Sequence, residues 1–197
     1  MPLTVGVPIV SQPAFIRINP DRLATLSLCR AANAMEQAAA DPTTWFFIIL
    51  DLNRAVTAAL VAALSAYDFA EAYDAEFRAR LKAFLEDDAQ EPGPFRVPFL
   101  KGLLRLAAAG TTSMQPLQLT QEQSDDILTL NNYRHRLEHV KPETLSLDST
   151  DLPRIAKNAA GAFEVMFQVF KHHLEPHEIE RTNCALGKLG WSPTRPD

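Results

Sequence analysis

The residues best suited to acid–base chemistry lie in one short segment, 131–142, which has the sequence NNYRHRLEHVKP. In this segment His135 and His139 are four residues apart, and Arg134 and Glu138 have the same spacing. Residues four apart lie on the same face of a helix. The two histidines could therefore converge on one object, such as a metal ion or a phosphate group, while the arginine pairs with the glutamate. The simplest alternative is a solvated polar face.

Apolar residues in and before this segment recur every three or four positions, which indicates an amphipathic helix. They are Ile127, Leu130, Tyr133, Leu137 and Val140. Thr120 and Gln123 form a capping pair at its start. Pro142 ends it, because proline disfavours helix in the preceding residue and has no N–H to donate. We therefore predict a helix over residues 121–140.

On the polar side of this helix the side chains separate into two strips. One strip consists of Asn132, His135 and His139, and the other of Asn131, Arg134 and Glu138. The two strips lie on either side of the face opposite Leu137.

The same residues fit a zinc-binding alternative. The run 135–139 matches His-x-x-Glu-His, in which two histidines one turn apart bind Zn²⁺ and the glutamate activates water. Two ligands do not make a site, and the downstream candidates for a third follow no recognisable pattern: Glu164, Glu175, His177 and Glu178. Proteases that use this motif are also much larger than this chain. We therefore expect no stoichiometric zinc and no other cofactor.

Composition indicates a globular protein with one core. The chain has 197 residues, 47% of them hydrophobic, which favours a single domain. Cys29 and Cys184 are far apart in the sequence, and free thiols fit a reducing compartment. The net charge of −5 argues against a protein that coats nucleic acid indiscriminately. Segment 68–91 alone holds eight acids against three bases, so a locally positive cleft near the motif remains compatible with this charge.

The most hydrophobic segment, 45–64, contains Asp51, Asn53 and Arg54 at its middle. A bilayer would penalise each by roughly 2–3 kcal/mol, so we interpret the segment as a buried core helix and expect no membrane association. The N-terminus has no positive charge before Arg17, and prolines interrupt it, unlike a signal sequence. We therefore predict a cytoplasmic protein.

The fold class follows from the helical segments. Helices are predicted over residues 19–40, 44–67, 69–85, 99–109, 121–140 and 152–174. Helix 44–67 has the widest apolar stripe, which favours a central position, and helix 152–174 carries Phe and Met at near-heptad spacing, as in a bundle seam. We predict an all-α antiparallel helical bundle over residues 19–174. An extended arm, 1–18, precedes it, and a tail, 175–197, follows with a short helix at most.

Arg134 followed by His139, late on a helix of an all-helical domain, resembles the signature of the HEPN superfamily. In that superfamily an arginine precedes a histidine by four to six residues, often with a polar residue directly after the arginine, as His135 is here. The stretch 133–142 with its sequel to residue 155 is also similar to uncharacterised bacterial HEPN-like proteins. These have a tryptophan-led apolar helix upstream, as segment 45–64 is here, so the resemblance covers residues 44–170.

The resemblance implies a helical bundle of HEPN type and a metal-independent ribonuclease, in which two protomers bring their motifs together in a shared cleft. His139 would act as general base or acid on the ribose 2′-OH, suited to this by a reference pKa near 6.5. Arg134 would hold the scissile phosphate and its developing charge. His135 or Asn132 would orient the reacting group or share the proton transfer.

The partners expected from this resemblance are a second copy of the chain and an RNA substrate, with an antitoxin or another protein as a further partner in a toxin or defence system. RNA binding is expected from four basic residues around the motif: Arg136, Lys141, Arg154 and Lys157. The alternative is a non-catalytic HEPN-like module that uses the same face for dimerisation or interaction.

Overall fold

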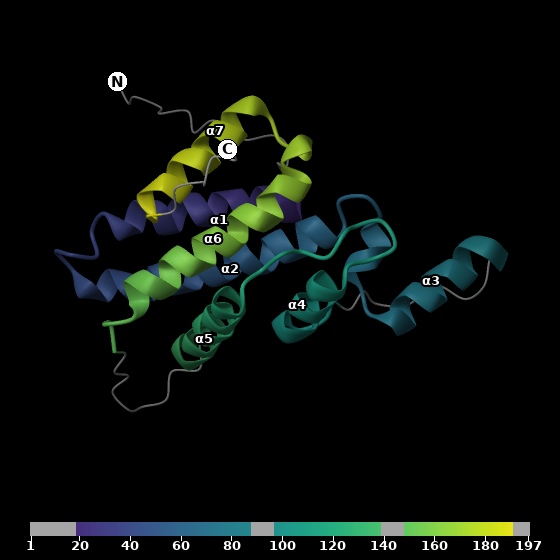
Figure 1. Cartoon of the computed structure of the whole chain (residues 1–197), viewed down its shortest axis with the longest axis horizontal. Helices are drawn as coiled ribbons and strands as arrows, with labels where there is room; N and C mark the ends of the chain where they lie inside the picture. Colours follow the sequence, from purple (N-terminus) through teal and green to yellow (C-terminus); the bar gives the residue numbers. More distant parts are fainter. Residues whose placement is uncertain (1–18, 88–96, 139–147, 191–197) are drawn as a thin grey trace, which may run out of the picture.

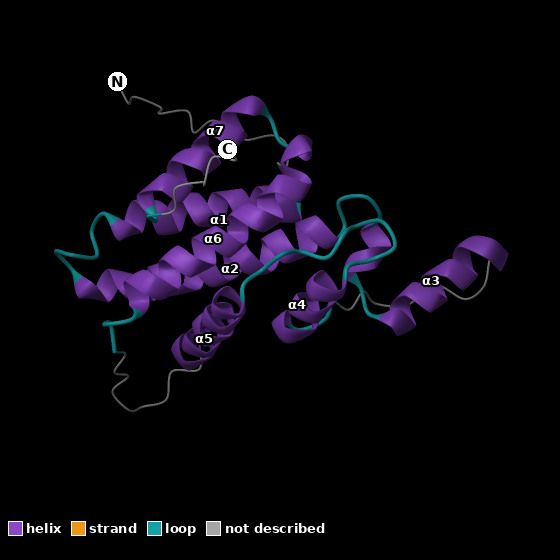
Figure 2. Cartoon of the chain, in the orientation of Figure 1, coloured by secondary structure: helices purple, strands orange, loops and turns teal. Residues whose placement is uncertain are grey.

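The computed structural model describes residues 19–87, 97–138 and 148–190, and within these ranges it contains helices and no β-strand. Seven α-helices appear in Figures 1 and 2: α1 (Pro20–Met35), α2 (Trp45–Leu64), α3 (Ala75–Asp87), α4 (Leu100–Ala109), α5 (Gln121–Glu138), α6 (Leu152–Phe170) and α7 (Pro176–Lys188). Three short 3₁₀ helices join them: η1 (Pro42–Thr44), η2 (Phe69–Ala72) and η3 (Lys171–His173). The predicted all-α helical bundle is confirmed.

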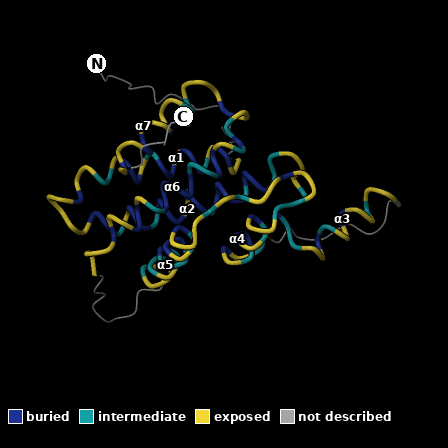
Figure 3. The backbone as a smooth tube through the Cα atoms, viewed as in Figure 1, coloured by how far each residue is buried: buried dark blue, intermediate teal, exposed yellow. Residues whose placement is uncertain are grey.

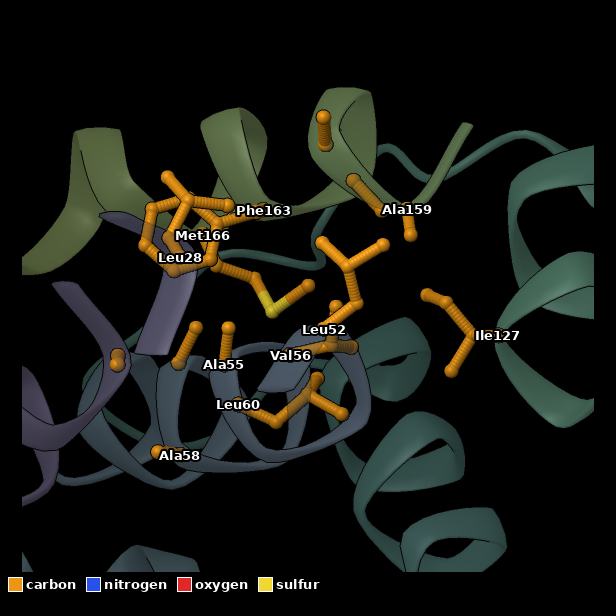
Figure 4. Close-up of a cluster of buried hydrophobic side chains, with 14 of the residues drawn as sticks. Leu28, Leu52, Ala55, Val56, Ala58, Leu60, Ile127, Ala159, Phe163 and Met166 are labelled. Atoms are coloured by element: carbon orange, nitrogen blue, oxygen red, sulfur yellow. The ribbon is translucent and has the colours of Figure 1, made fainter. Parts of the chain in front are cut away.

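Helix α2 is the centre of the bundle, as its apolar stripe predicts. It packs against α1, α4, α5 and α6, and its contact with α1 is the most extensive of all helix pairs. Leu52, Val56 and Leu60 of α2 point into a cluster with Phe163 of α6 and Ile127 of α5 (Figure 4). Buried residues concentrate where these helices meet, whereas α3 is mostly exposed (Figure 3).

The segment 42–64 contains an 18-residue window that is apolar enough to cross a membrane, with a mean hydropathy of 1.8, but 72% of that window is buried inside the bundle. This burial is what the core helix of a soluble protein shows. Two of the polar residues in its middle, Asp51 and Arg54, are paired within the fold. The Asp51 carboxylate lies 3.3 Å from Arg30 of α1 and 3.4 Å from Arg54 of its own helix.

Aspartate caps break the predicted third helix, 69–85, into two elements, so the prediction of one continuous helix is wrong. The Asp68 carboxylate accepts a hydrogen bond of 2.9 Å from the backbone N–H of Ala70 at the start of η2. Asp74 accepts one of 2.7 Å from the N–H of Phe77 and starts α3. Both side chains satisfy N–H groups that a helix start leaves free. The first helix also ends early, because residues 36–40 form turns after Met35.

Two sets of hydrogen bonds stabilise α5, one at its start and one to α6. The predicted capping pair is confirmed: the Gln123 N–H donates to the Thr120 hydroxyl (3.1 Å), and the Thr120 N–H donates to the Gln123 side chain (2.9 Å). The buried Asp126 carboxylate accepts hydrogen bonds of 2.6 Å each from Arg154 and Asn158 of α6. Charge-assisted bonds of this kind are short and strong, so they fix α5 against α6.

The segment expected as a tail, 175–197, contains a full helix, α7, which packs against α1. Glu175 and Glu178 form a capping box at its start, and Ala185 and Leu186 are buried. The bundle therefore continues past residue 174 to the end of α7. The predicted arm, 1–18, lies outside the described residues.

The packing of α7 on α1 brings together two cysteines that the sequence separates. Cys29 and Cys184 are free thiols that line one pocket, and the Cys29 thiol lies 3.7 Å from the carbonyl oxygen of Arg181. Burial raises the pKa of the Cys29 thiol above its ordinary value, and the nearby Arg181 guanidinium opposes this only in part. Cys29 therefore holds less thiolate at neutral pH than a free cysteine does.

Because the thiolate is the nucleophile, we expect iodoacetamide to modify Cys184 faster than Cys29 near pH 7.5. The rate at Cys29 should keep rising at pH values where that of a free cysteine levels off, since its raised pKa moves ionisation to higher pH. Mass spectrometry of peptides alkylated between pH 7 and 10 measures both rates. Equal rates at neutral pH would contradict this assignment.

Candidate functional site

Arg134, the predicted phosphate ligand, lies in the last turns of α5 and faces the interior in part. Its side chain is 31% exposed and lines a pocket of about 340 Å³ between α1, α2 and α5. The volume is at the lower end of the range for small-molecule sites. The pocket is a direct consequence of the fold, because α1 and α5 both pack against α2.

The pocket has apolar walls and a few polar groups. Leu23 of α1 with Leu50 and Val61 of α2 supply apolar surface. Asn53 and Arg54 of α2 supply polar groups on the same side of the bundle as Arg134. A largely apolar cavity with a small number of placed polar groups is the usual composition of a ligand site.

Two residues that line this pocket each have a buried N–H donor with no hydrogen-bond acceptor among the described residues: Arg134 at Nε and Asn53 at Nδ2. Both atoms are buried, and Asn53 as a whole is only 2% exposed. A buried donor without a partner costs about 1–3 kcal/mol, so native proteins rarely keep one without a reason. These two donors therefore mark the pocket as a place where an acceptor is expected.

Among the described residues, Glu138 is the anion paired with Arg134, as its spacing on the helix predicts. Its Oε2 lies 3.4 Å from Arg134 Nε, at a geometry that makes no hydrogen bond. Glu138 is 47% exposed at the end of α5, so solvent weakens this ion pair to about 0–1 kcal/mol. The pair is confirmed, but it leaves the arginine able to bind another anion.

The other predicted catalytic and RNA-binding residues of α5 that the structure describes lie on its outer surface. Asn132, His135 and Arg136 are exposed, and none of them lines the pocket. The structure therefore does not gather the predicted site residues of α5 into one cavity. It places Arg134 at the pocket and leaves Asn132 and His135 on the open side of the same helix.

His139 and Lys141 lie outside the described residues, which end at Glu138 in this part of the chain. The pairing of Arg134 with His139 therefore stays a prediction, as does the convergence of the two histidines. Across the described ranges, no group of three His, Cys, Asp or Glu side chains is placed to hold a metal ion.

Of the two predicted RNA contacts on α6, Arg154 already has carboxylate partners. Its guanidinium is bonded to Asp126, and it also lies 3.4 Å from Glu122 and 3.8 Å from Asp151. These contacts give it a structural role between α5 and α6, and its binding to RNA stays a prediction. Lys157 is exposed one turn further along α6.

Asn53 and Arg54 are the functional candidates that the sequence analysis did not identify. Both are polar residues in an otherwise apolar helix, which is a sequence feature that could have identified them. The sequence analysis interpreted this feature only as evidence against a membrane span. Their role became visible when the fold placed them beside Arg134.

No protein-family model matches this chain, and no curated protein or solved structure matches it either. Function is therefore inferred from the chemistry of the site and from the motif.

Proposed function

We propose that the protein is a metal-independent RNA endonuclease of the HEPN type that acts as a homodimer. The observation that carries the proposal is the state of Arg134. Its guanidinium is half-buried at the end of α5, with an Nε–H donor that no acceptor of the described residues occupies. A fixed cation with a free donor is suited to bind a phosphate.

Arg134 would bind the scissile phosphate and stabilise the charge that develops on its oxygens. The planar guanidinium offers two parallel N–H donors to two phosphate oxygens. Arg134 Nε makes no hydrogen bond to Glu138, so binding a phosphate at this atom breaks no hydrogen bond with that carboxylate. Helix α5 is anchored to α6 through Asp126, so the arginine is held on a rigid element.

His139 would perform the acid–base chemistry. It would remove the proton from the ribose 2′-OH, and the 2′ oxygen attacks the adjacent phosphorus while the bond to the 5′ oxygen breaks. The leaving 5′ oxygen takes up a proton, either from His135, which would share the proton transfer, or from the protonated His139. The products are a 2′,3′-cyclic phosphate and a 5′-OH, so the reaction needs no water and no metal ion. Asn132 and His135, which are exposed on α5, would complete the site from the open side of the helix.

The second protomer would close the cleft. An isologous dimer places the same surface of both copies face to face, so two α5 helices would present their motifs to one RNA strand. Lys157, Arg136 and Lys141 would contact the RNA backbone, with Arg154 as a further candidate. An antitoxin or other protein could cover the same face in the cell.

The second candidate function is a non-catalytic interaction module, and exposed apolar residues favour it. Among the described residues, Phe99 before α4 is 95% exposed and Leu85 in α3 is 70% exposed, and a protein partner that covered them would bury apolar surface. The ion pair of Arg134 with Glu138 points the same way. RNA cleavage separates the two functions, whereas dimer formation is expected from both.

The proposal is tested with purified full-length protein and single-stranded RNA in EDTA. We expect cleavage that leaves a 2′,3′-cyclic phosphate, while single-stranded DNA of the same sequence survives because it lacks the 2′-OH. Mass spectrometry of the fragments identifies the new ends. Cleavage that requires Mg²⁺ or that also destroys DNA would contradict the proposal, and absence of cleavage across diverse RNAs would favour the interaction module.

A further inference from the structure

The pocket beside Arg134 has features that phosphate binding leaves unexplained. Most of its wall is apolar, and its most buried polar residue is Asn53 of α2. Binding of an RNA phosphate at Arg134 requires neither the apolar wall nor Asn53. RNA backbone is hydrophilic and gains little from apolar walls. A ligand that fits the whole pocket needs an apolar body as well as an acceptor.

The polar end of this ligand is defined by the unpaired donors. Arg134 and Asn53 both line the pocket, and each has a buried donor, Nε and Nδ2 respectively, that makes no hydrogen bond to the described residues. They come from different helices, α5 and α2, so the fold brings them to one cavity. A carboxylate has two oxygens and can accept from both donors at once.

The charges around the pocket favour an anion. Arg54 and Arg134 line it with one carboxylate, Glu138. Arg54 is balanced only in part, because the Asp51 carboxylate is shared with Arg30. The pocket lining therefore holds two guanidinium groups and one carboxylate, and the excess positive charge is one that a bound monoanion would neutralise.

From these observations we propose that the pocket binds a small organic monocarboxylate with an apolar body. The carboxylate accepts hydrogen bonds from Arg134 and Asn53, and the body contacts Leu23, Leu50 and Val61. The inference does not rest on RNA cleavage, since it concerns binding in the absence of RNA.

The experiment uses three probes that separate charge from apolar contact: octanoate, octylamine and acetate. Isothermal titration calorimetry with the full-length protein should show octanoate binding at least about tenfold more tightly than either other probe, because only octanoate has both features. In a ¹⁵N-labelled sample, octanoate should shift the side-chain amide signal of Asn53. Octylamine or acetate binding as tightly as octanoate would overturn the proposal.

Two variants test the polar end of the site, one at a donor and one at the competing carboxylate. Asn53→Leu removes one hydrogen bond to a charged group at similar volume, so octanoate affinity should fall by about tenfold or more. Glu138→Gln removes the competing carboxylate at an exposed position, and octanoate affinity should rise by about two- to fivefold. Asn183→Leu, at an exposed position of α7, is the control that should leave affinity unchanged.

Glu138→Gln keeps the test decisive if Asn53→Leu does not fold, because Glu138 is half exposed and carries little packing. An affinity that stays the same in Glu138→Gln, or in folded Asn53→Leu, would overturn the proposal. These results are independent of the nuclease assay: octanoate binding can fail while RNA is cleaved, and the reverse.

Discussion

Replacing His139 with alanine is expected to reduce RNA cleavage by about 10²–10⁴-fold, the usual effect of removing a positioned acid–base group. The rate of cleavage of a defined RNA in EDTA measures the loss. Thermal unfolding should show little change, because a residue of the polar strip contributes little to the core. The matched control is His177→Ala, at an exposed position of α7, which should keep full activity.

Arg134→Ala should reduce cleavage by a similar factor through lost stabilisation of the phosphate. Arg134→Lys should recover only part of the activity, since a lysine cannot reproduce the two parallel donors of a guanidinium. Arg105→Ala, an exposed arginine of α4, controls for a general loss of positive charge. Cleavage that persists unchanged in both His139→Ala and Arg134→Ala would indicate a contaminating nuclease.

The second large effect is expected in the core. Phe163→Ala should lower the free energy of unfolding by about 3–5 kcal/mol, because it removes a large, fully buried side chain and leaves a cavity. Phe163 is 0% exposed and its ring stacks near Phe167 (6.0 Å between ring centroids) and meets Phe170 edge-on (6.3 Å). It also packs on the α2 cluster that positions α5 (Figure 4).

Urea unfolding followed by circular dichroism measures this change. Phe99→Ala is the matched control: the same side chain is 95% exposed there, so its removal should change the free energy of unfolding by no more than about 0.5 kcal/mol. Equal losses in the two variants would show that the α2–α6 interface is not the main core.

The parts of the fold that follow from local pattern were predictable from the sequence. The apolar stripes of α2 and α6 predicted both helices and their central positions in the bundle, because a helix with a wide apolar face must bury it. The start of α5 was also readable, since Thr120 and Gln123 form a capping pair through bonds within one turn.

The errors have physical causes. The predicted helix 69–85 runs through Asp74, but the Asp74 carboxylate caps α3 and separates it from η2. Helix α7 was given too little weight because its moderate apolar face becomes stable only when it packs on α1. Charged residues near a helix start are ambiguous in sequence, since the same aspartate suits a solvated face and a cap.

The candidate site divides in the same way. The strip on α5 was predicted because its residues are neighbours on one helix, and the ion pair of Arg134 with Glu138 follows from that spacing. The pocket depends on contacts between α1, α2 and α5, so Asn53 and Arg134 meet only in the folded chain. Sequence periodicity carries no information on such a meeting.

The central claim, cleavage through the ribose 2′-OH, is tested most directly with an RNA that carries one 2′-deoxy substitution. The site of cleavage is first mapped in the unmodified RNA, and the nucleotide on its 5′ side is then replaced with its deoxy form. Our account predicts that cleavage at this bond disappears while cleavage at the other mapped bonds continues, since each bond depends on its own 2′-OH. Continued cleavage at the substituted bond would contradict the account, because the nucleophile would then come from elsewhere.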